Sequence, residues 1–182
     1  VGGAEDKLDS PSILRRFVSL SGRDKARIAI IPTASQLDDT GERYQDIFKS
    51  LGAQDCHALP YVERTDAERD DWHELLEQAT GVFFTGGNQL RISTILGGTR
   101  VATTIRRLNA RGVTVGGTSA GAAVLPEHMI AYGSTGGTPK AGMVSLAPGL
   151  GLTNRFVIDQ HFRERDRLGR LLTALSTNPF AV

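Results

Sequence analysis

Short apolar runs that alternate with amphipathic segments constrain the fold of this chain most strongly. Five runs are predicted to be strands: residues 28–31, 56–59, 81–85, 113–115 and 156–158. Six segments with apolar residues at helical spacing are predicted to be helices: residues 13–20, 41–51, 68–79, 90–96, 99–111 and 163–176. Continuous apolar runs are typical of strands buried on both faces of a parallel sheet. The alternation therefore predicts a three-layer α/β fold, in which helices cover both faces of an open, mostly parallel sheet.

Two glycine pairs follow predicted strands of this sheet. Gly86 and Gly87 come after residues 81–85, and Gly116 and Gly117 come after residues 113–115. Ligands of open α/β sheets bind beyond the carboxyl ends of the strands, where such loops lie. We therefore expect both loops at the same edge of the sheet, with the glycine-rich segment 126–148 as a loop or hairpin over the site.

The second glycine pair opens a Gly-x-Ser-x-Gly motif centred on Ser119. Gly117 and Gly121 flank the serine at two residues on either side, and small residues follow it. A strand that turns sharply into a helix at such a motif exposes the serine hydroxyl as a nucleophile. The structural alternative is a glycine-rich loop in which Ser119 only caps the next helix.

A serine hydroxyl needs a base, and histidine has the suitable chemistry. His161 lies just after a predicted strand and is favoured over His128, while His57 and His73 are interpreted as structural residues. The backbone amide of Ala120, with an amide of Gly87 or Asn88, would form an oxyanion hole.

Arginines cluster after His161. On a helix, Arg163, Arg167 and Arg170 would share one face, and Arg165 would lie on another. These side chains either form a solvent-exposed helix face or bind a substrate carboxylate, which the planar guanidinium binds with two hydrogen bonds.

Composition narrows the classes of function. The 182 residues suit one domain, and 21 Lys+Arg against 20 Asp+Glu leave a net charge of +1, so no global field favours nucleic acid or an anionic membrane. The single cysteine, Cys56, excludes an internal disulfide framework and a multi-thiolate zinc site. The glycine motifs of nucleotide-binding loops, G-x-G-x-x-G and G-x-x-x-x-G-K-[ST], do not occur in the sequence. We expect no cofactor and no metal. No apolar stretch reaches the roughly 20 residues of a membrane span, and a cytoplasmic protein is expected.

Three motifs together give the chain a resemblance to a known family. Residues 84–89 (FTGGNQ), 116–123 (GGTSAGAA) and 159–162 (DQHF) closely resemble cyanophycinase and its relatives in serine peptidase family S51. Supporting matches occur at residues 2–7, 31–35, 148–152 and 165–171. The resemblance covers essentially the whole chain in order.

The resemblance implies a fold like that of class I glutamine amidotransferase domains and an exopeptidase that cleaves the β-aspartyl-arginine units of cyanophycin. This polymer has a poly-aspartate backbone with arginine on each side chain. By motif, Ser119 corresponds to the nucleophile and His161 to its base. The substrate pocket is implied at Gln89, Asp159, Gln160, Arg165, Arg167 and Arg170. A homodimer is expected, and an aspartyl dipeptidase of the same family is the alternative activity.

The chain departs from the family pattern in two respects. Gly137 stands where the resemblance implies the glutamate of the catalytic triad. Either Asp159 or Glu127 takes that role, or the protein is a catalytically impaired relative that binds without turnover. Family members also begin with a strand before Gly2 and continue past Pro179, so residues 1–182 are expected to be one domain truncated at both ends.

Overall fold

A four-stranded parallel sheet forms the centre of the computed structural model, which describes residues 1–3, 5–178 and 180–181. The strands lie in the order β2-β1-β3-β4. Their bounds are β1 Arg27–Ile31, β2 Asp55–Ala58, β3 Gly81–Phe84 and β4 Thr114–Gly117. Phe84 pairs in register with Ile31 on one side and Gly117 on the other, so three strands end level with one another. The loops that follow them emerge at one edge, as expected.

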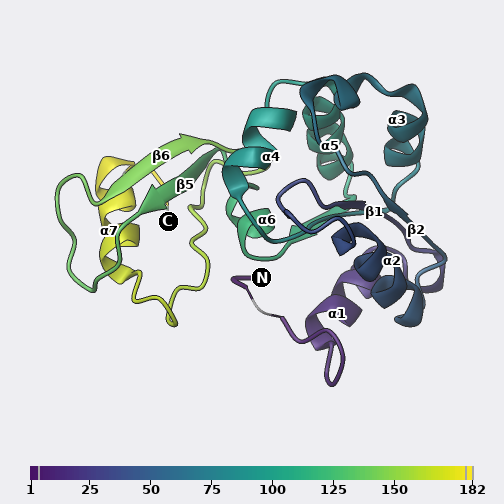
Figure 1. Ribbon diagram of the computed structural model, residues 1–182, viewed down its shortest axis with the longest axis horizontal. Helices are drawn as coiled ribbons and strands as arrows, with labels where there is room; N and C mark the ends of the chain where they lie inside the picture. The colour runs from purple at the N-terminus through teal and green to yellow at the C-terminus, as the bar shows by residue number, and fades with distance from the viewer. Residues whose placement is uncertain (4, 179, 182) are drawn as a thin grey trace.

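Helices cover both faces of the sheet (Figure 1). One face carries α1 (Ser12–Leu20) and α2 (Thr40–Ser50), and a short 3₁₀ turn at Arg23–Lys25 leads from α1 into β1. There Phe17, Phe48 and Phe83 pack edge-on or tilted, with ring centroids 5.1 to 5.5 Å apart. Aromatic pairs in this range stabilise beyond their buried area.

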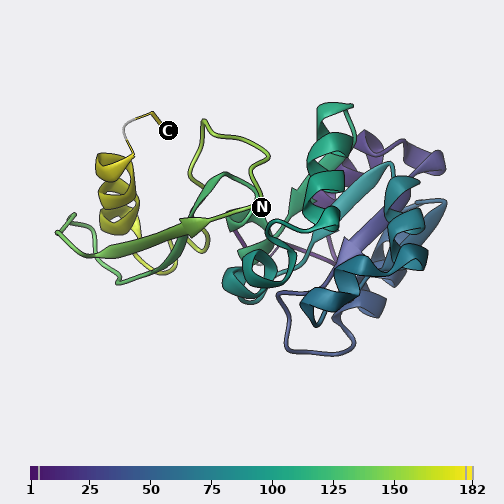
Figure 2. The ribbon, with the colours of Figure 1, turned by 90° about the horizontal axis from the view of Figure 1, so that it is seen from above.

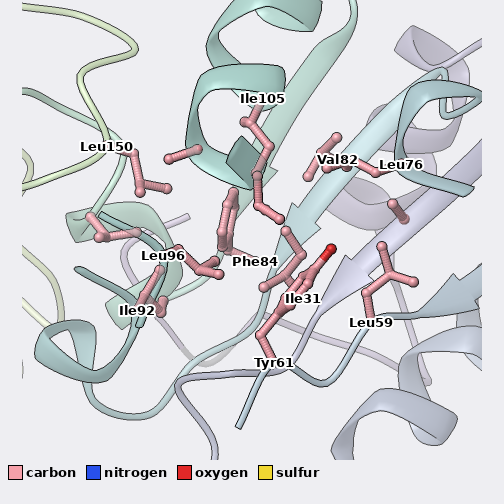
Figure 3. Packing of buried hydrophobic residues seen from close by; sticks show 14 of the residues in the cluster. Ile31, Leu59, Tyr61, Leu76, Val82, Phe84, Ile92, Leu96, Ile105 and Leu150 are labelled. Atoms are coloured by element: carbon pink, nitrogen blue, oxygen red, sulfur yellow. The ribbon is translucent and has the colours of Figure 1, made fainter. Parts of the chain in front are cut away.

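The opposite face carries the larger core. Four helices and a 3₁₀ segment cover it: Arg64–Glu68, α3 Asp70–Glu77, α4 Gln89–Leu96, α5 Arg100–Ala110 and α6 Ala120–Ala123. Figure 3 shows Ile31, Val82 and Phe84 of the sheet packed among Ile92, Leu96 and Ile105 of the helices, all at most 1% exposed. The three-layer α/β prediction is therefore confirmed.

A smaller part follows α6 and lies beside the central sheet (Figures 1 and 2). It consists of an antiparallel hairpin, β5 (His128–Gly133) and β6 (Val144–Pro148), and the helix α7 (Leu168–Thr177). Ile130, Val157 and Ala174 form its own small core. The hairpin expected within residues 126–148 is present.

Two predictions for the last part of the chain are wrong. Residues 156–158 form no strand, and the helix predicted from residue 163 begins only at Leu168. Asp166 has a φ of 46°, which an α-helix does not allow, so no helix can run through this residue. Of the leucines at helical spacing in this segment, Leu171 and Leu175 pack against the small core around Ala174, whereas Leu168 and Leu172 are 45% and 41% exposed. No helix among the described residues is long and apolar enough to cross a bilayer.

Candidate active site

The Gly-x-Ser-x-Gly motif forms a sharp turn between β4 and α6. Ser119 has a φ of 51° and a ψ of −115°, which non-glycine residues rarely adopt. A Cβ at Gly117 would lie 2.4 Å from the carbonyl oxygen of Gly121, and one at Gly121 would lie 2.3 Å from that of Phe84. Only glycine fits at both flanking positions. The side chain of Ser119 makes no capping hydrogen bond, so the turn presents the hydroxyl instead of using it to cap the start of α6.

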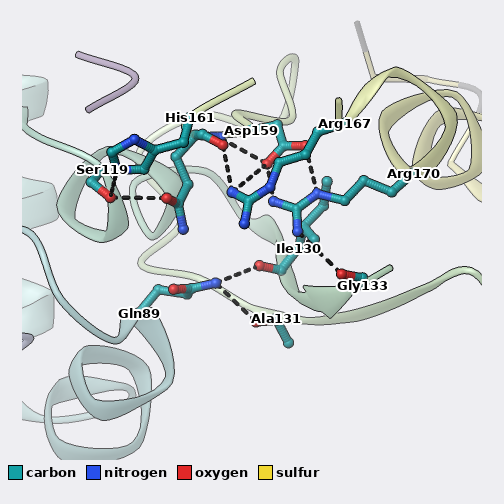
Figure 4. A network of polar contacts seen from close by, with 10 residues as sticks. Gln89, Ser119, Ile130, Ala131, Gly133, Asp159, His161, Arg167 and Arg170 are labelled. Carbon is teal, nitrogen blue, oxygen red and sulfur yellow. Dashed lines mark hydrogen bonds and ion pairs between the residues drawn. The ribbon is translucent and has the colours of Figure 1, made fainter. Parts of the chain in front are cut away.

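The hydroxyl of Ser119 faces His161. Its Oγ lies 3.0 Å from Nε2 of the imidazole and 2.9 Å from the side-chain oxygen of Gln160 (Figure 4). His161 sits in a loop, with a φ of 47°, and not at a strand end. The alternative base, His128, is exposed in β5, where it pairs with Pro148. The geometry therefore joins Ser119 with His161, at a distance that suits proton transfer.

The first residues of the chain hold both members of this pair. The amide of Ser119 donates to the carbonyl of Val1 over 2.9 Å, and the amide of His161 donates to that of Gly2 over 2.7 Å. Gly3, with a φ of 140°, packs directly against the imidazole; a Cβ there would lie 2.5 Å from Nε2. Residues 1–3 thus fix the nucleophile and the histidine relative to each other.

Two of the three predicted oxyanion-hole amides are available. Gly87 lines a cavity together with Ser119, and Ala120 is the first residue of α6. Within the described parts of the chain, neither amide donates a hydrogen bond. The amide of Asn88 instead donates to the carbonyl of Ala34 over 2.9 Å, and its side chain caps α4. Asn88 therefore organises the loop and is not placed to bind an oxyanion.

A cavity of about 340 Å³ opens beside the nucleophile. Of the predicted site residues it is lined by Ser119, His161 and Gly87, and the glycine motifs also contribute Gly86 and Thr118. The other lining residues were not predicted: Glu5, Lys7, Ser35, Thr40, Arg43, Tyr44 and Ile47. They come from the start of the chain, the loop after β1 and α2. The size lies at the lower end of the roughly 300–1,000 Å³ typical of small-molecule sites.

Glu5 is a buried carboxylate that lines this cavity. It accepts hydrogen bonds from the hydroxyls of Tyr44 and Thr118 and pairs with the Lys7 ammonium over 3.0 Å. Burial raises the pKa of this carboxyl, but the hydrogen bonds from Thr118, Tyr44 and Lys7 outweigh burial and hold the pKa below its ordinary value. Glu5 therefore stays ionised and ties α2 to Thr118, the neighbour of the nucleophile.

This lowered pKa makes the contribution of Glu5 to stability depend on pH. A folded-state pKa below the unfolded value stabilises the fold above the unfolded pKa, and the stabilisation is lost as the pH falls through the folded pKa. Glu5→Gln should therefore lower the free energy of unfolding at pH 7, and its difference from the wild type should shrink below pH 4.5, the ordinary pKa. Urea unfolding at several pH values measures this. Exposed Glu68→Gln is the control; equal pH profiles for both variants would contradict the prediction.

Most residues of the predicted substrate pocket are engaged with one another. The carboxylate of Asp159 accepts two hydrogen bonds from the Arg170 guanidinium, with Nε at 2.8 Å, and its side chain is 2% exposed. Arg167 donates to the carbonyl of Gln160, and Gln89 donates to the carbonyls of Ile130 and Ala131 (Figure 4). This buried network joins the His161 loop to α7, while Gln89 links α4 to β5.

The arginines do not share a helical face as predicted. Arg167 and Arg170 are buried at 8% and 3% exposure, and Arg163 and Arg165 lie exposed in the turn before α7. Of the predicted pocket residues, the structure brings only Gln160 into contact with Ser119. A solvated face describes neither Arg167 nor Arg170, because both are buried. Arg170 is bound to Asp159, whereas Arg167 donates to the Gln160 carbonyl and its Nε has no partner among the described residues.

No carboxylate takes the place of the triad acid among the described residues. Gly137 lies in the loop between β5 and β6, and Asp159 is paired with Arg170. Glu127 is exposed and forms no ion pair with His161 within residues 1–3, 5–178 and 180–181. The imidazole is held by its backbone and by contact with Gly3, and not by a charged partner.

The Asp159–Arg170 pair predicts a large effect on stability. Arg170→Leu leaves a carboxylate uncompensated in the interior, and such losses cost roughly 3–5 kcal/mol of unfolding free energy. Arg165→Leu, on an exposed side chain nearby, should change it by less than about 0.5 kcal/mol. Chemical denaturation of the two variants measures the difference. Equal stability would show that the buried pair does not hold the loop.

The fold and the site together define the class of this protein: an α/β protein with a serine nucleophile elbow and a histidine within hydrogen-bond distance. The family described as Peptidase family S51 matches residues 1–181, and the chain belongs to this family.

Similar proteins agree with that assignment. A cyanophycinase of Geminocystis herdmanii is 46% identical over 98% of this chain and 66% of its own length. A cyanophycinase of Trichormus variabilis is 45% identical, over 98% of this chain and 61% of its own length. The chain thus spans less than two thirds of these relatives.

Solved structures bear on the fold. A peptidase from an acI-B1 Actinobacterium superposes with a TM-score of 0.72 at 24% identity, over 94% of this chain and 72% of its own. A putative peptidase E protein from Listeria monocytogenes gives 0.59 at 19% identity, over 88% and 81%. The predicted class I glutamine amidotransferase-like architecture is confirmed.

Proposed function

We propose that this protein is a serine-type exopeptidase that hydrolyses β-aspartyl-arginine units of cyanophycin and releases aspartyl-arginine dipeptides. The observation that carries the proposal is the 3.0 Å contact between Ser119 Oγ and His161 Nε2 at the elbow. The names of the similar cyanophycinases, at 45% and 46% identity, supply the substrate class. The partner is accordingly a peptide polymer. A homodimer and a cytoplasmic location remain predictions.

The geometry supports hydrolysis through an acyl-enzyme. His161 takes the hydroxyl proton as the oxygen of Ser119 attacks the scissile carbonyl carbon. The amides of Gly87 and Ala120 are the donors for the oxyanion. His161 then protonates the leaving amine as the C–N bond breaks. Water, activated by the same histidine, hydrolyses the serine ester and restores the free hydroxyl.

Incubation of the purified protein with cyanophycin, followed by mass detection of the dipeptide, tests the proposal. α-Aspartyl dipeptides serve as the competing substrate. Release of aspartyl-arginine from the polymer with little cleavage of α-aspartyl dipeptides is expected. The reverse preference would favour an aspartyl dipeptidase, and cleavage of neither would overturn the peptidase proposal.

A binding protein without turnover is the second candidate, because no described carboxylate contacts His161. An active-site serine reagent separates the two. A peptidase should be labelled at Ser119 and lose dipeptide release in proportion to labelling. A protein that binds cyanophycin but resists the reagent would support the binding role.

A further inference from the structure

The cavity beside Ser119 carries positive charge that the protein does not neutralise. Two cationic side chains line it, Lys7 and Arg43, and Glu5 is the only acidic residue among its lining residues. Among the lysine, arginine, aspartate and glutamate side chains that line it, the charge is therefore two positive against one negative. An anionic group would complete the balance.

Neither cation is fully used by the fold. The Lys7 ammonium pairs with the Glu5 carboxylate, donates to the Glu5 carbonyl over 3.4 Å and lies 5.6 Å from the ring centroid of Tyr44, yet its side chain is 31% exposed. Since an ammonium has three donors, Lys7 retains capacity for a ligand oxygen. Arg43 is exposed in the first turns of α2 and forms no ion pair with any residue the structure describes.

The two buried arginines that the sequence offered for anion binding, Arg167 and Arg170, lie elsewhere. Arg170 is paired with Asp159, and Arg167 donates to the carbonyl of Gln160. Neither lines the cavity that contains Ser119. A substrate anion bound next to the nucleophile would therefore meet Lys7 and Arg43.

We propose that Lys7 and Arg43 form a carboxylate-binding subsite for the peptide that is cleaved at Ser119. The inference rests on the proposed function and names the residues that select its substrate. An aspartyl-arginine unit joined through the aspartate side chain keeps a free carboxylate on its arginine, and a chain-terminal aspartate has a free main-chain carboxylate. Both present the same chemistry, and an arginine guanidinium reaching into the cavity binds such a group well.

The affinity of the Ser119→Ala variant for dipeptide ligands measures the subsite without turnover. The probes are aspartyl-arginine dipeptide and its two singly amidated forms, one blocked at the arginine carboxylate and one at the aspartate α-carboxylate. Calorimetry at low salt should show one amide binding about tenfold more weakly than the free dipeptide, because one charge-assisted contact is lost. The weaker amide identifies which carboxylate occupies the subsite. Equal affinities for all three probes would overturn the proposal.

Charge-removing variants locate the subsite. In the same background, Arg43→Gln and Lys7→Gln should each weaken the free dipeptide about tenfold and erase the difference between it and the weaker amide. Lys49→Gln, exposed on the same helix but outside the cavity, should leave binding unchanged. Since Lys7 also supports Glu5, Arg43→Gln is the decisive variant. Wild-type affinity and selectivity in Arg43→Gln would refute the subsite.

The two proposals fail in different ways. Dipeptide release by the wild type, with no change in binding for either variant, would contradict the subsite and leave the peptidase standing. Selective carboxylate binding lost in Arg43→Gln, in a protein that releases no dipeptide, would support the subsite and contradict the peptidase.

Discussion

Replacing Ser119 with alanine is expected to reduce the rate of aspartyl-arginine release by at least about 100-fold. In a complete serine–histidine–acid triad, loss of the serine costs about 2 × 10⁶ in kcat and loss of the acid alone about 3 × 10⁴. A pair without its acid thus keeps an advantage on the order of 10². Because Ser119 contacts His161 at 3.0 Å without a described acid partner, this factor is the minimum that its removal should cost.

The size of the loss carries information beyond its direction. A fall near 10² would mean that no group replaces the triad acid. A fall near 10⁶ would mean that residues 1–3, by orienting His161, replace most of what the acid contributes to the rate. Steady-state release measured by mass detection gives the ratio. Ser93→Ala, which removes a hydroxyl bonded to the Leu90 carbonyl in α4, is the control. Release by Ser119→Ala equal to that of this control would contradict Ser119 as the nucleophile.

Gly3→Ala is expected to lower kcat by roughly 100-fold with a smaller effect on KM. The added Cβ would lie 2.5 Å from the imidazole atoms Cε1 and Nε2, and the glycine φ of 140° already disfavours any side chain. His161 must then move from its 3.0 Å contact with Ser119, and a shift of about 1 Å in a catalytic group can cost 10²-fold.

Gly2→Ala provides a matched control for this substitution. A Cβ at Gly2 meets nothing within 4 Å, so the same chemical change one residue earlier should leave kcat within a few-fold of the wild type. Thermal unfolding of both variants separates displacement of His161 from loss of the fold. Equal kcat values for the two variants would show that Gly3 does not position the histidine.

Much of the fold follows from local patterns. The strands β1 and β3 are buried on both faces, and this burial requires the apolar runs that identify them in the sequence. Residues 156–158 have the same composition but no partner strand, so the pattern there reflects burial of Val157 against α7. Short apolar runs do not distinguish a strand from a packed extended loop.

The elbow was predictable for the same local reason, since a tight turn restricts its residues to small ones. His161 was predicted from a strand end that the structure lacks, and a loop brings it to Ser119 instead. The role of the arginines was not predictable. Their helical spacing was counted from residue 163, but the helix begins only at Leu168, so Arg163 and Arg165 lie outside it. The oxyanion-hole role predicted for Asn88 does not fit the structure, because its amide donates to the carbonyl of Ala34, a residue far away in sequence. Lys7 and Arg43 were missed because only the folded chain brings α2 and residues 5–7 beside Ser119.

The backbone of Ser119 sets a trade-off between folding stability and reactivity. Its φ of 51° falls where glycine is favoured, and such conformations cost on the order of 1–3 kcal/mol for other residues. In a protein that only bound its ligand, glycine at this position would remove that cost and give up only the contacts of the Ser119 hydroxyl with Gln160 and His161. The presence of serine there, at a cost to the fold, is what selection for turnover would maintain and selection for binding alone would not.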